Sequence, residues 1–310
     1  MSLELTVSWS EIEAIRQCDK KHQLSYIERW SEGTEGPALR RGNVWHKVLE
    51  HWYSADRTNP ESALEATDRI DKLLTGDPEE ELFRWMFIGY LRRWRQEDAG
   101  WRVQGVEVQD VVPMPRPPGV TPLVDWLGRE IATYLKLKVD VLVETPGVNG
   151  SRRLWVVDHK SGGSLPGDKA MEFEDQFGLY IWVMRQIGRP VYGAIHNGAL
   201  AKMNKTEREK PKALEDRFVR IPTVRTDREL DEIARDAYLS IKQGWQEYLL
   251  EGSSYRAGRT PNGDTCRYRC PFTETCLTGR QQGWEVEQQV MIGRGHVKGT
   301  YTNLVEVEDA

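Results

Sequence analysis

The sequence predicts an α/β (α+β) fold in which a central mixed sheet is flanked by helices. Tyr134 to Val143 alternates apolar and polar residues, as a half-buried strand does, and Leu154 to Val157 is apolar on both faces, as a central strand is. Helical periodicity precedes and follows these strands. Apolar residues make up 39% of the 310 residues, which is enough for a sizeable core and too many for a disordered chain.

The first helix is expected close to the N-terminus. Ser8-Trp-Ser-Glu11 has the spacing of a capping box, in which the serine hydroxyl accepts a hydrogen bond at the start of a helix. Cys18 lies just past the end of this short helix. A loop rich in glycine and glutamate is expected at residues 31–37.

Two more helices are expected before the strands. Apolar residues recur at helical spacing from Ala38 to about Tyr53 and again over residues 78–98. In the first of these two helices, His46 and Glu50 are four residues apart and therefore share a face.

The strands carry acidic residues at informative places. Val103 to Val111 reads as a strand that leads into a proline-rich loop at 113–122. Asp140 is on the polar face of the alternating strand. The next strand ends in Asp158-His-Lys160-Ser-Gly-Gly, so the side chains of Asp158 and Lys160 leave the same face beside a glycine turn.

The remaining elements are a helix from about Met171 to Ile187, a strand from Val191 to Ile195 and a long amphipathic helix over 227–251. Between the last two, residues 202–225 carry eight basic and four acidic side chains. Two interpretations of this basic segment stand side by side, a solvated loop and a local nucleic-acid contact.

Composition excludes several classes of protein. No segment approaches the roughly 20 continuous apolar residues of a membrane-spanning helix. The N-terminus lacks the pattern of a secretory signal, so the cytoplasm is the expected compartment. A net charge of −5 argues against nonspecific coating of nucleic acid but allows an enzyme with a locally basic groove. The sequence also lacks a phosphate-binding Gly-x-x-x-x-Gly-Lys-Ser/Thr loop.

The acidic and basic residues at the strand ends suit phosphodiester chemistry. Asp140 and Asp158 would be neighbours if their strands form a hairpin, and His46 supplies a candidate nitrogen ligand. Two carboxylates and an imidazole suit Mg²⁺ or Mn²⁺, which polarises a water and shields a phosphate. Lys160 would face the charge that develops on the phosphate. Each residue alone has a commoner structural explanation, and their joint order is what favours a site.

This order of motifs resembles a known family. Gly42-x-x-x-His46, Val139-Asp-Val141, Val156-Val-Asp-His-Lys-Ser-Gly162 and Gln176-x-x-x-Tyr180 follow one another as in the RecB-like branch of the PD-(D/E)XK nuclease superfamily. The resemblance covers residues 40–195 and implies a restriction-endonuclease-like core.

The resemblance also implies roles for individual residues. It implies His46, Asp140 and Asp158 as metal ligands and Lys160 as the catalytic lysine. The resemblance further implies that Gln176 and Tyr180 line the site and contact DNA or Lys160. In addition, Glu107 stands where some members of the family carry a further acidic residue.

The four cysteines form a second candidate site. Cys266, Cys270 and Cys276 are close in sequence, whereas Cys18 is distant. Together they could hold a [4Fe–4S] cluster or a zinc ion, and the spacing does not choose between them. One cysteine before the core and three after it resembles the iron–sulfur clasp of AddB and of CRISPR-associated RecB-like exonucleases, which implies [4Fe–4S]. The trio of those proteins is often Cys-x-x-Cys followed by five residues and a third cysteine. In this sequence three residues, rather than two, separate Cys266 from Cys270.

The resemblance implies three segments and a function. They are an N-terminal helical segment with the first cysteine (1–37), a RecB-like core with a helical insertion at about 55–100 (38–200), and a C-terminal segment with the basic loop, long helix and three cysteines (201–310). The implied function is a metal-dependent exonuclease acting on linear DNA in recombination, repair or processing. A partner-dependent end-processing nuclease, as in CRISPR spacer acquisition, and a catalytically silent DNA-binding module are the alternatives.

Overall fold

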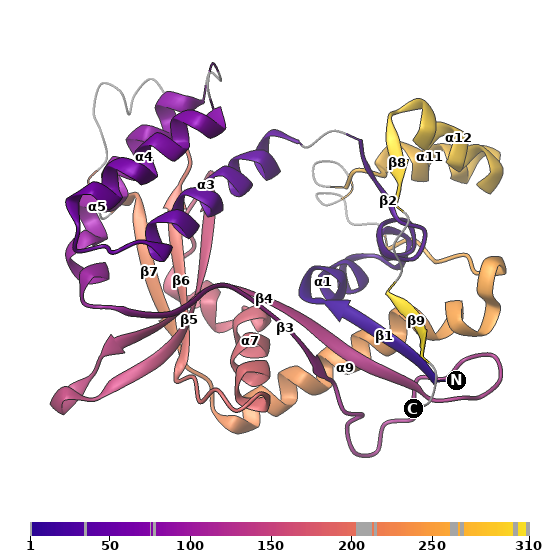
Figure 1. Cartoon of the computed structure of the whole chain (residues 1–310). Helices are drawn as coiled ribbons and strands as arrows, with labels where there is room; N and C mark the ends of the chain where they lie inside the picture. The colour runs from indigo at the N-terminus through magenta and orange to yellow at the C-terminus, as the bar shows by residue number, and fades with distance from the viewer. Residues whose placement is uncertain are drawn as a thin grey trace. The chain divides into compact units, whose positions relative to one another are not determined.

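The structure is a computed structural model of the chain and describes residues 2–33, 36–74, 76, 79–202, 213, 216–260, 266, 270–299 and 303–307 (Figure 1). The chain forms two compact units. Unit 1 comprises Met1–Gly36, Val111–Lys136 and Ala234–Ala310, and unit 2 comprises Pro37–Asp110 and Leu137–Ile233. The three segments expected from the sequence stay a prediction.

Unit 2 is built on a mixed sheet, as predicted. Its strands are β3 (Arg102–Pro113), β4 (Ile131–Pro146), β5 (Arg152–Gly162), β6 (Gly193–Leu200) and β7 (Phe218–Thr223), of which β3 and β4 continue into unit 1. The β4–β5 and β6–β7 pairs are antiparallel, and β5 and β6 are parallel. β3 pairs with β4. The alternation seen in the sequence of β4 is reproduced as alternating buried and exposed side chains up to Val139.

Three helices cover one face of this sheet: α3 (Pro37–Ser54), α4 (Pro60–Leu74) and α5 (Glu80–Ala99) (Figure 1). The helix expected at 38–53 is confirmed, and α4 lies in the predicted helical insertion. Their apolar faces share one core with the strands, and the largest side chains in it include Trp45, Trp52, Phe83 and Phe87. Trp94, Trp101 and Trp155 are buried in the same core.

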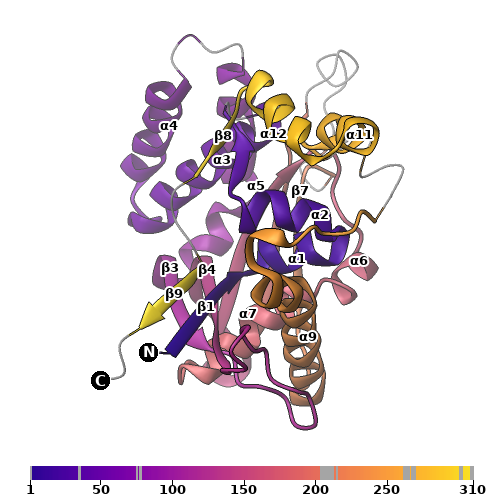
Figure 2. The same ribbon diagram turned by 90° about the vertical axis from the view of Figure 1, so that its right-hand side faces the viewer.

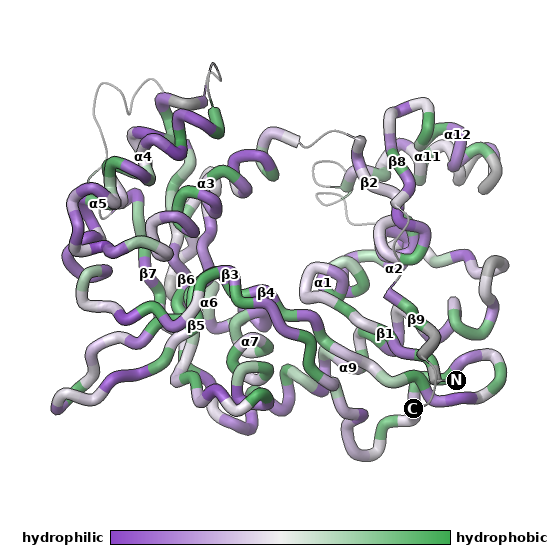
Figure 3. Tube along the Cα trace, in the orientation of Figure 1, coloured by the Kyte–Doolittle hydropathy of each residue, from purple (hydrophilic) through white to green (hydrophobic). Residues whose placement is uncertain are grey.

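The opposite face of the sheet is covered by α7 (Asp175–Gln186), in which every residue from Phe177 to Met184 is buried; Figure 3 shows how hydrophobic this helix is. A single helix over 171–187 was expected, and this is wrong. The chain forms α6 (Asp168–Glu172), leaves the helical conformation at Phe173 and Glu174, and then begins α7.

Unit 1 begins with β1 (Ser2–Ser8), a strand not anticipated from the sequence. It pairs in parallel with the first residues of β4 and antiparallel with β9 (Leu304–Val307) (Figure 2). The predicted helix follows as α1 (Trp9–Gln17), with the Ser8 hydroxyl accepting a hydrogen bond from the Glu11 N–H at 3.4 Å. The Glu11 carboxylate is buried and accepts hydrogen bonds from His22, Trp245 and Asn303.

The rest of unit 1 contains short elements and part of one long helix. These are α2 (Asp19–His22), a π-helical turn (Gln23–Ile27), β2 (Trp30–Glu32) paired with β8 (His296–Lys298), α11 (Thr273–Gln282), α12 (Trp284–Gly293), and the part of α9 (Asp227–Glu251) that begins at Ala234. A short 3₁₀ turn of this unit lies at Gly252–Ser254, and another, in unit 2, lies at Val148–Gly150. The prediction for α9 is confirmed, whereas β2 begins the segment that was expected to be a loop.

The basic segment at 202–225 is only partly described. Lys205, Arg208, Lys210 and Lys212 lie outside the described residues. Arg217 and Arg220 are buried rather than solvated, so the solvated-loop interpretation is wrong for them. The Arg217 guanidinium stacks over the ring of Trp85 at 3.8 Å. In the described part of the chain, no helix has both the length and the hydropathy needed to span a bilayer.

Candidate active site

The β4–β5 hairpin places the two aspartates. Val141 pairs with Val157, so Asp140 and Asp158 lie just beyond the last regular pair of this ladder. The peptide N–H of His159 donates a hydrogen bond of 2.7 Å to Asp140 Oδ2. This bond orients the Asp140 carboxylate at the point where the two strands diverge.

His46 reaches the same place from α3. Its Nδ1 lies 3.2 Å from Asp140 Oδ1. Burial alone would raise the pKa of Asp140, but the hydrogen bond from His46, the charge of that imidazole and the hydrogen bond from the His159 peptide N–H lower it to about 2. For His46, the effect of burial is outweighed by the Asp140 carboxylate, which raises the pKa of the imidazole. Asp140 therefore stays ionised and able to bind a cation across the physiological pH range.

Glu107 on β3 completes a group of possible ligands. Donor atoms of His46, Glu107 and Asp140 all lie within 4.8 Å of one another. The backbone of Glu107 has φ 52°, in the left-handed region that costs a residue with a Cβ about 1–2 kcal/mol. Its carboxylate also forms an ion pair with Lys138. One nitrogen and two carboxylate oxygens form a donor set that fits Mg²⁺ or Mn²⁺.

Asp158 and Lys160 form an ion pair next to this group. Asp158 Oδ2 lies 2.9 Å from Lys160 Nζ, and the lysine side chain is 45% exposed while that of the aspartate is 5% exposed. Burial and the charge of Asp140 raise the pKa of Asp158, opposed by Lys160. The pKa of Lys160 is raised because the carboxylates outweigh the effect of burial. The ammonium group is thus charged and accessible to a ligand.

A comparison with protein families identifies the chain. A model of the PD-(D/E)XK nuclease superfamily matches residues 6–277. The chain belongs to this superfamily. Membership indicates a metal-dependent nuclease with DNA as its substrate, and the observed sheet flanked by helices is consistent with the restriction-endonuclease-like fold.

A solved structure is similar over most of its length. The crystal structure of SSO0001 has 11% sequence identity to this PD-(D/E)XK protein and a TM-score of 0.33, over 87% of this chain and 85% of that chain. No curated protein matched the sequence.

The remaining pair of predicted site residues lies on α7 of the nuclease. Gln176 Nε2 donates a hydrogen bond of 2.6 Å to the hydroxyl of Tyr180, one helical turn away. The two side chains therefore act as one unit. Their expected contacts with DNA or Lys160 stay a prediction.

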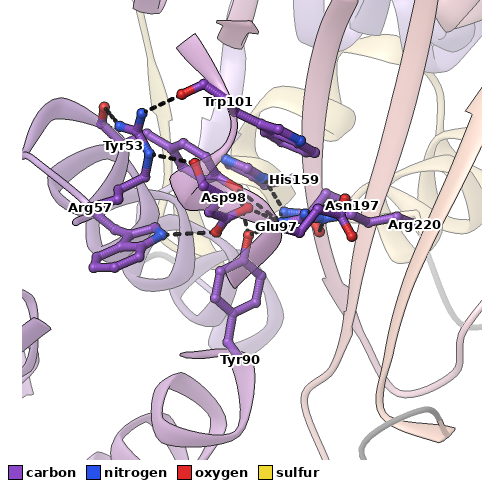
Figure 4. Close-up of polar contacts among 10 residues, drawn as sticks. Tyr53, Arg57, Tyr90, Glu97, Asp98, Trp101, His159, Asn197 and Arg220 are labelled. Carbon is purple, nitrogen blue, oxygen red and sulfur yellow. Dashed lines mark hydrogen bonds and ion pairs between the residues drawn. The ribbon is translucent and has the colours of Figure 1, made fainter. Parts of the chain in front are cut away.

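A buried polar network of this PD-(D/E)XK nuclease includes His159, the residue between Asp158 and Lys160 (Figure 4). Asn197 Nδ2 donates a 2.9 Å hydrogen bond to His159 Nδ1, and the His159 ring stacks on Tyr53 with centroids 5.3 Å apart. Burial lowers the pKa of His159 to about 3, so its imidazole is neutral. The His159 side chain, between Asp158 and Lys160 in sequence, is thereby fixed by a hydrogen bond from Asn197 and by the ring of Tyr53.

Arg220 on β7 is the centre of the network. Its guanidinium lies 2.6 Å from Asp98 Oδ1 and 4.2 Å from the ring centroids of both Trp94 and Trp101. It also donates hydrogen bonds to Asn197, Tyr53, Tyr90 and Glu97. Asp98 additionally accepts from Trp52 Nε1 at 3.0 Å. The buried positive charge of Arg220 is thus paired with a carboxylate, and its N–H groups donate hydrogen bonds to several neighbours.

The sequence did not point to Asp98, His159, Asn197 or Arg220 as members of the site. His159 could have been noticed as the residue between two site residues. Asp98 and Arg220 are 122 residues apart, and each belongs to a segment with other charged residues nearby. Only the burial of their side chains in the structure distinguishes them.

The cysteines belong to unit 1 of the nuclease. Cys18 is at the end of α1, Cys276 is on α11, and the Thr273 hydroxyl binds the carbonyl oxygens of Cys266 and Cys270. Cys270 is close enough to Cys18 and Cys266 for their charges to act on it. Burial raises the pKa of both Cys270 and Cys276. The chain thus brings Cys18 close to Cys270, which is more than 250 residues away in sequence.

Proposed function

We propose that this protein is a metal-dependent DNA exonuclease with a RecB-like core that hydrolyses phosphodiester bonds of linear DNA in recombination, repair or DNA processing. The observation that carries the proposal is the convergence of His46, Glu107 and Asp140 beside the Asp158–Lys160 pair. These residues come from different elements of one unit, so their proximity does not follow from chain neighbourhood. An intact acid–lysine pair also argues against a catalytically silent DNA-binding module.

Each residue has a distinct part in the proposed reaction. A divalent cation, when bound, would supply positive charge to the phosphate and lower the pKa of a water so that hydroxide forms near neutral pH. Addition of hydroxide to phosphorus breaks the bond from phosphorus to one sugar oxygen, which leaves and takes up a proton. His46, Glu107, Asp140 and Asp158 would hold the cation. Lys160 keeps its proton and faces the negative charge that develops on the phosphate, while Asp158 holds the ammonium in place at 2.9 Å. No covalent enzyme intermediate is needed.

The direct test is digestion of end-labelled DNA. Single-stranded linear DNA, double-stranded linear DNA and a closed circle are incubated with Mg²⁺ and then with Mn²⁺. An exonuclease degrades the linear molecules progressively from an end and leaves the circle intact, and the position of the label reports the direction. Cleavage of the circle at a comparable rate would contradict exonuclease action, and failure to cut any substrate would contradict the nuclease.

Glu107→Gln is expected to weaken Mn²⁺ binding at least about tenfold, because loss of even an outer partner of a metal site has effects of this size. The affinity is measured by the EPR signal of free Mn²⁺ or by calorimetry. Glu144→Gln is the matched control, because Glu144 is also a strand glutamate paired with a cation, Arg152. Equal Mn²⁺ affinity in the two variants would remove Glu107 from the ligand set.

For the cysteines we propose a [4Fe–4S] cluster held by Cys18, Cys266, Cys270 and Cys276. The support is that Cys18, far from the trio in sequence, lies close enough to Cys270 for its charge to act on that thiol. Cysteine thiolates are the ligands of such clusters. Four thiolates can also bind zinc, and the metal content of the purified protein decides between the two.

Protein purified without oxygen is expected to be brown, with absorption near about 400 nm, as cysteine-ligated iron–sulfur centres are. Cys18→Ser and Cys276→Ser should each reduce this absorption and the iron content. A colourless preparation containing zinc would contradict the cluster. The cytoplasm, where thiols stay reduced, remains the proposed compartment, and a partner protein in recombination or DNA processing is part of the same proposal.

A further inference from the structure

The interruption between α6 and α7 exposes an aromatic residue. Phe173 ends α6 with φ −100° and ψ 5°, and Glu174 is extended with φ −88° and ψ 94°. The Phe173 side chain is 84% exposed, the largest exposed fraction among the large hydrophobic side chains that the structure describes. Burying a phenylalanine typically contributes about 1.5–3 kcal/mol, and the fold leaves this contribution unused.

The turn that presents Phe173 is held in place by the rest of unit 2. The Arg225 guanidinium donates hydrogen bonds of 2.8 Å to the carbonyl oxygens of both Met171 and Glu172. The Met171 side chain is buried. Arg225 therefore binds carbonyls that a continuous helix would use for its own hydrogen bonds, and it stabilises the break just before Phe173.

The same turn borders the active site. Phe177, in the first turn of α7, contacts the ring of His196 edge-on with centroids 6.0 Å apart. His196 is the neighbour of Asp158 in the β5–β6 ladder. The Glu174 carboxylate, next to Phe173, is close enough to Lys160 for its charge to act on the ammonium. The exposed Phe173 thus directly precedes a residue whose charge acts on the lysine that would face the scissile phosphate.

We propose that Phe173 is a stacking platform for an unpaired nucleobase of the DNA strand held at this site. The inference rests on the proposed nuclease function and adds to it a preference for single-stranded ends. A base in a duplex is already stacked on its neighbours, whereas an unpaired base offers a free π-face next to a charged phosphate. Aromatic side chains bind such bases with little dependence on sequence.

The test is a binding experiment with Ca²⁺ in place of Mg²⁺, so that affinity is measured without relying on cleavage. The probes are an end-labelled single-stranded oligonucleotide, the same strand with one abasic position moved stepwise along it, and a blunt duplex. The proteins are wild type, Phe173→Ala, Phe173→Leu and Phe173→Trp. Leu64→Ala is the matched control, since Leu64 is another exposed apolar residue of unit 2, on α4.

Phe173→Ala is expected to bind single-stranded DNA roughly 5- to 100-fold more weakly, the effect of one lost base–aromatic stack. Phe173→Leu should be nearly as weak, and Phe173→Trp should match wild type. Wild-type binding should weaken by the same factor when the abasic position is the one that would stack on Phe173. The affinity of Phe173→Ala should not depend on where the abasic position lies. Duplex affinity and the Leu64→Ala control should change less than about twofold.

Two results would overturn the inference. One is equal single-strand affinity of Phe173→Ala and wild type. The other is an identical response of these two proteins to the abasic series, which would mean that the ring touches no base. Circular dichroism of each variant separates loss of folding from loss of stacking. Phe173-dependent binding without any cleavage in Mg²⁺ or Mn²⁺ would instead reject the proposed nuclease function, and cleavage without Phe173 dependence would reject only the stacking platform.

Discussion

Lys160→Met is expected to lower the rate of DNA cleavage by at least about 10²- to 10³-fold, the loss seen when one preorganised electrostatic group is removed from a reacting centre. Methionine keeps an unbranched apolar stem like that of lysine but removes the ammonium group that would face the phosphate. The rate is measured under saturating Mg²⁺ on linear DNA. Asp158→Asn should cause a loss of similar size, because it removes a proposed ligand and the partner that holds the ammonium at 2.9 Å.

Two controls separate this effect from misfolding and from loss of metal. Lys72→Met removes an exposed lysine of α4 in the same unit and should leave cleavage unchanged. Lys160→Met should retain Mn²⁺ affinity, because an ammonium is not a ligand, whereas Asp158→Asn should bind Mn²⁺ more weakly. Cleavage by Lys160→Met within a few-fold of the wild-type rate would reject the proposed site.

Asp98→Ala is expected to destabilise the protein by about 3–5 kcal/mol, the cost of removing the buried partner of a buried charge. The substitution removes the carboxylate 2.6 Å from Arg220 and leaves only the half-exposed carboxylate of Glu97 as its partner. Two further hydrogen bonds to Asp98, from Trp52 and Tyr53, are lost at the same time. Urea unfolding followed by tryptophan fluorescence measures the change, because several tryptophans contact this network.

An Arg–Asp pair on the surface of unit 2 provides the comparison. Arg185 Nη1 lies 2.5 Å from Asp227 Oδ1, but the Asp227 side chain is 91% exposed. Asp227→Ala should therefore cost less than about 1 kcal/mol. The double variant Asp98→Leu, Arg220→Met should be more stable than Asp98→Ala, because it removes both charges together. A loss below about 1 kcal/mol for Asp98→Ala would show that water or another group replaces the carboxylate.

The effect of Asp98→Ala should extend to the active site. Arg220 binds Asn197, Asn197 binds His159, and the peptide N–H of His159 holds Asp140. If Arg220 shifts and its contact with Asn197 loosens, His159 is less firmly held between Asp158 and Lys160. Cleavage by the folded fraction of Asp98→Ala is therefore expected to be slower than that of wild type, measured at a temperature well below unfolding.

Local sequence patterns were sufficient for much of the fold. The Ser8 cap marks the start of α1, helical periodicity locates α3 and α9, and alternation locates β4. Each of these signals is contained within a few neighbouring residues, because helix and strand periods act over such distances. The order of the site motifs likewise points to the nuclease superfamily.

Other features depend on contacts between distant parts of the chain. The basic segment could not reveal that Arg220 is buried with Asp98, since both residues look like ordinary surface charges in sequence. The expected helix at 171–187 is broken where Arg225 binds carbonyl oxygens more than 50 residues away in sequence. The left-handed backbone of Glu107 also has no local signature.

Residue types and their periods therefore specified the helices, the strands and the motif order of this nuclease, because those preferences arise from short-range sterics and from which face of an element is apolar. Which charges are buried, where a helix stops for a partner and which acidic side chains meet were decided by the folded chain. These outcomes depend on desolvation and hydrogen-bond geometry, which exist only once residues far apart in the sequence have been brought together.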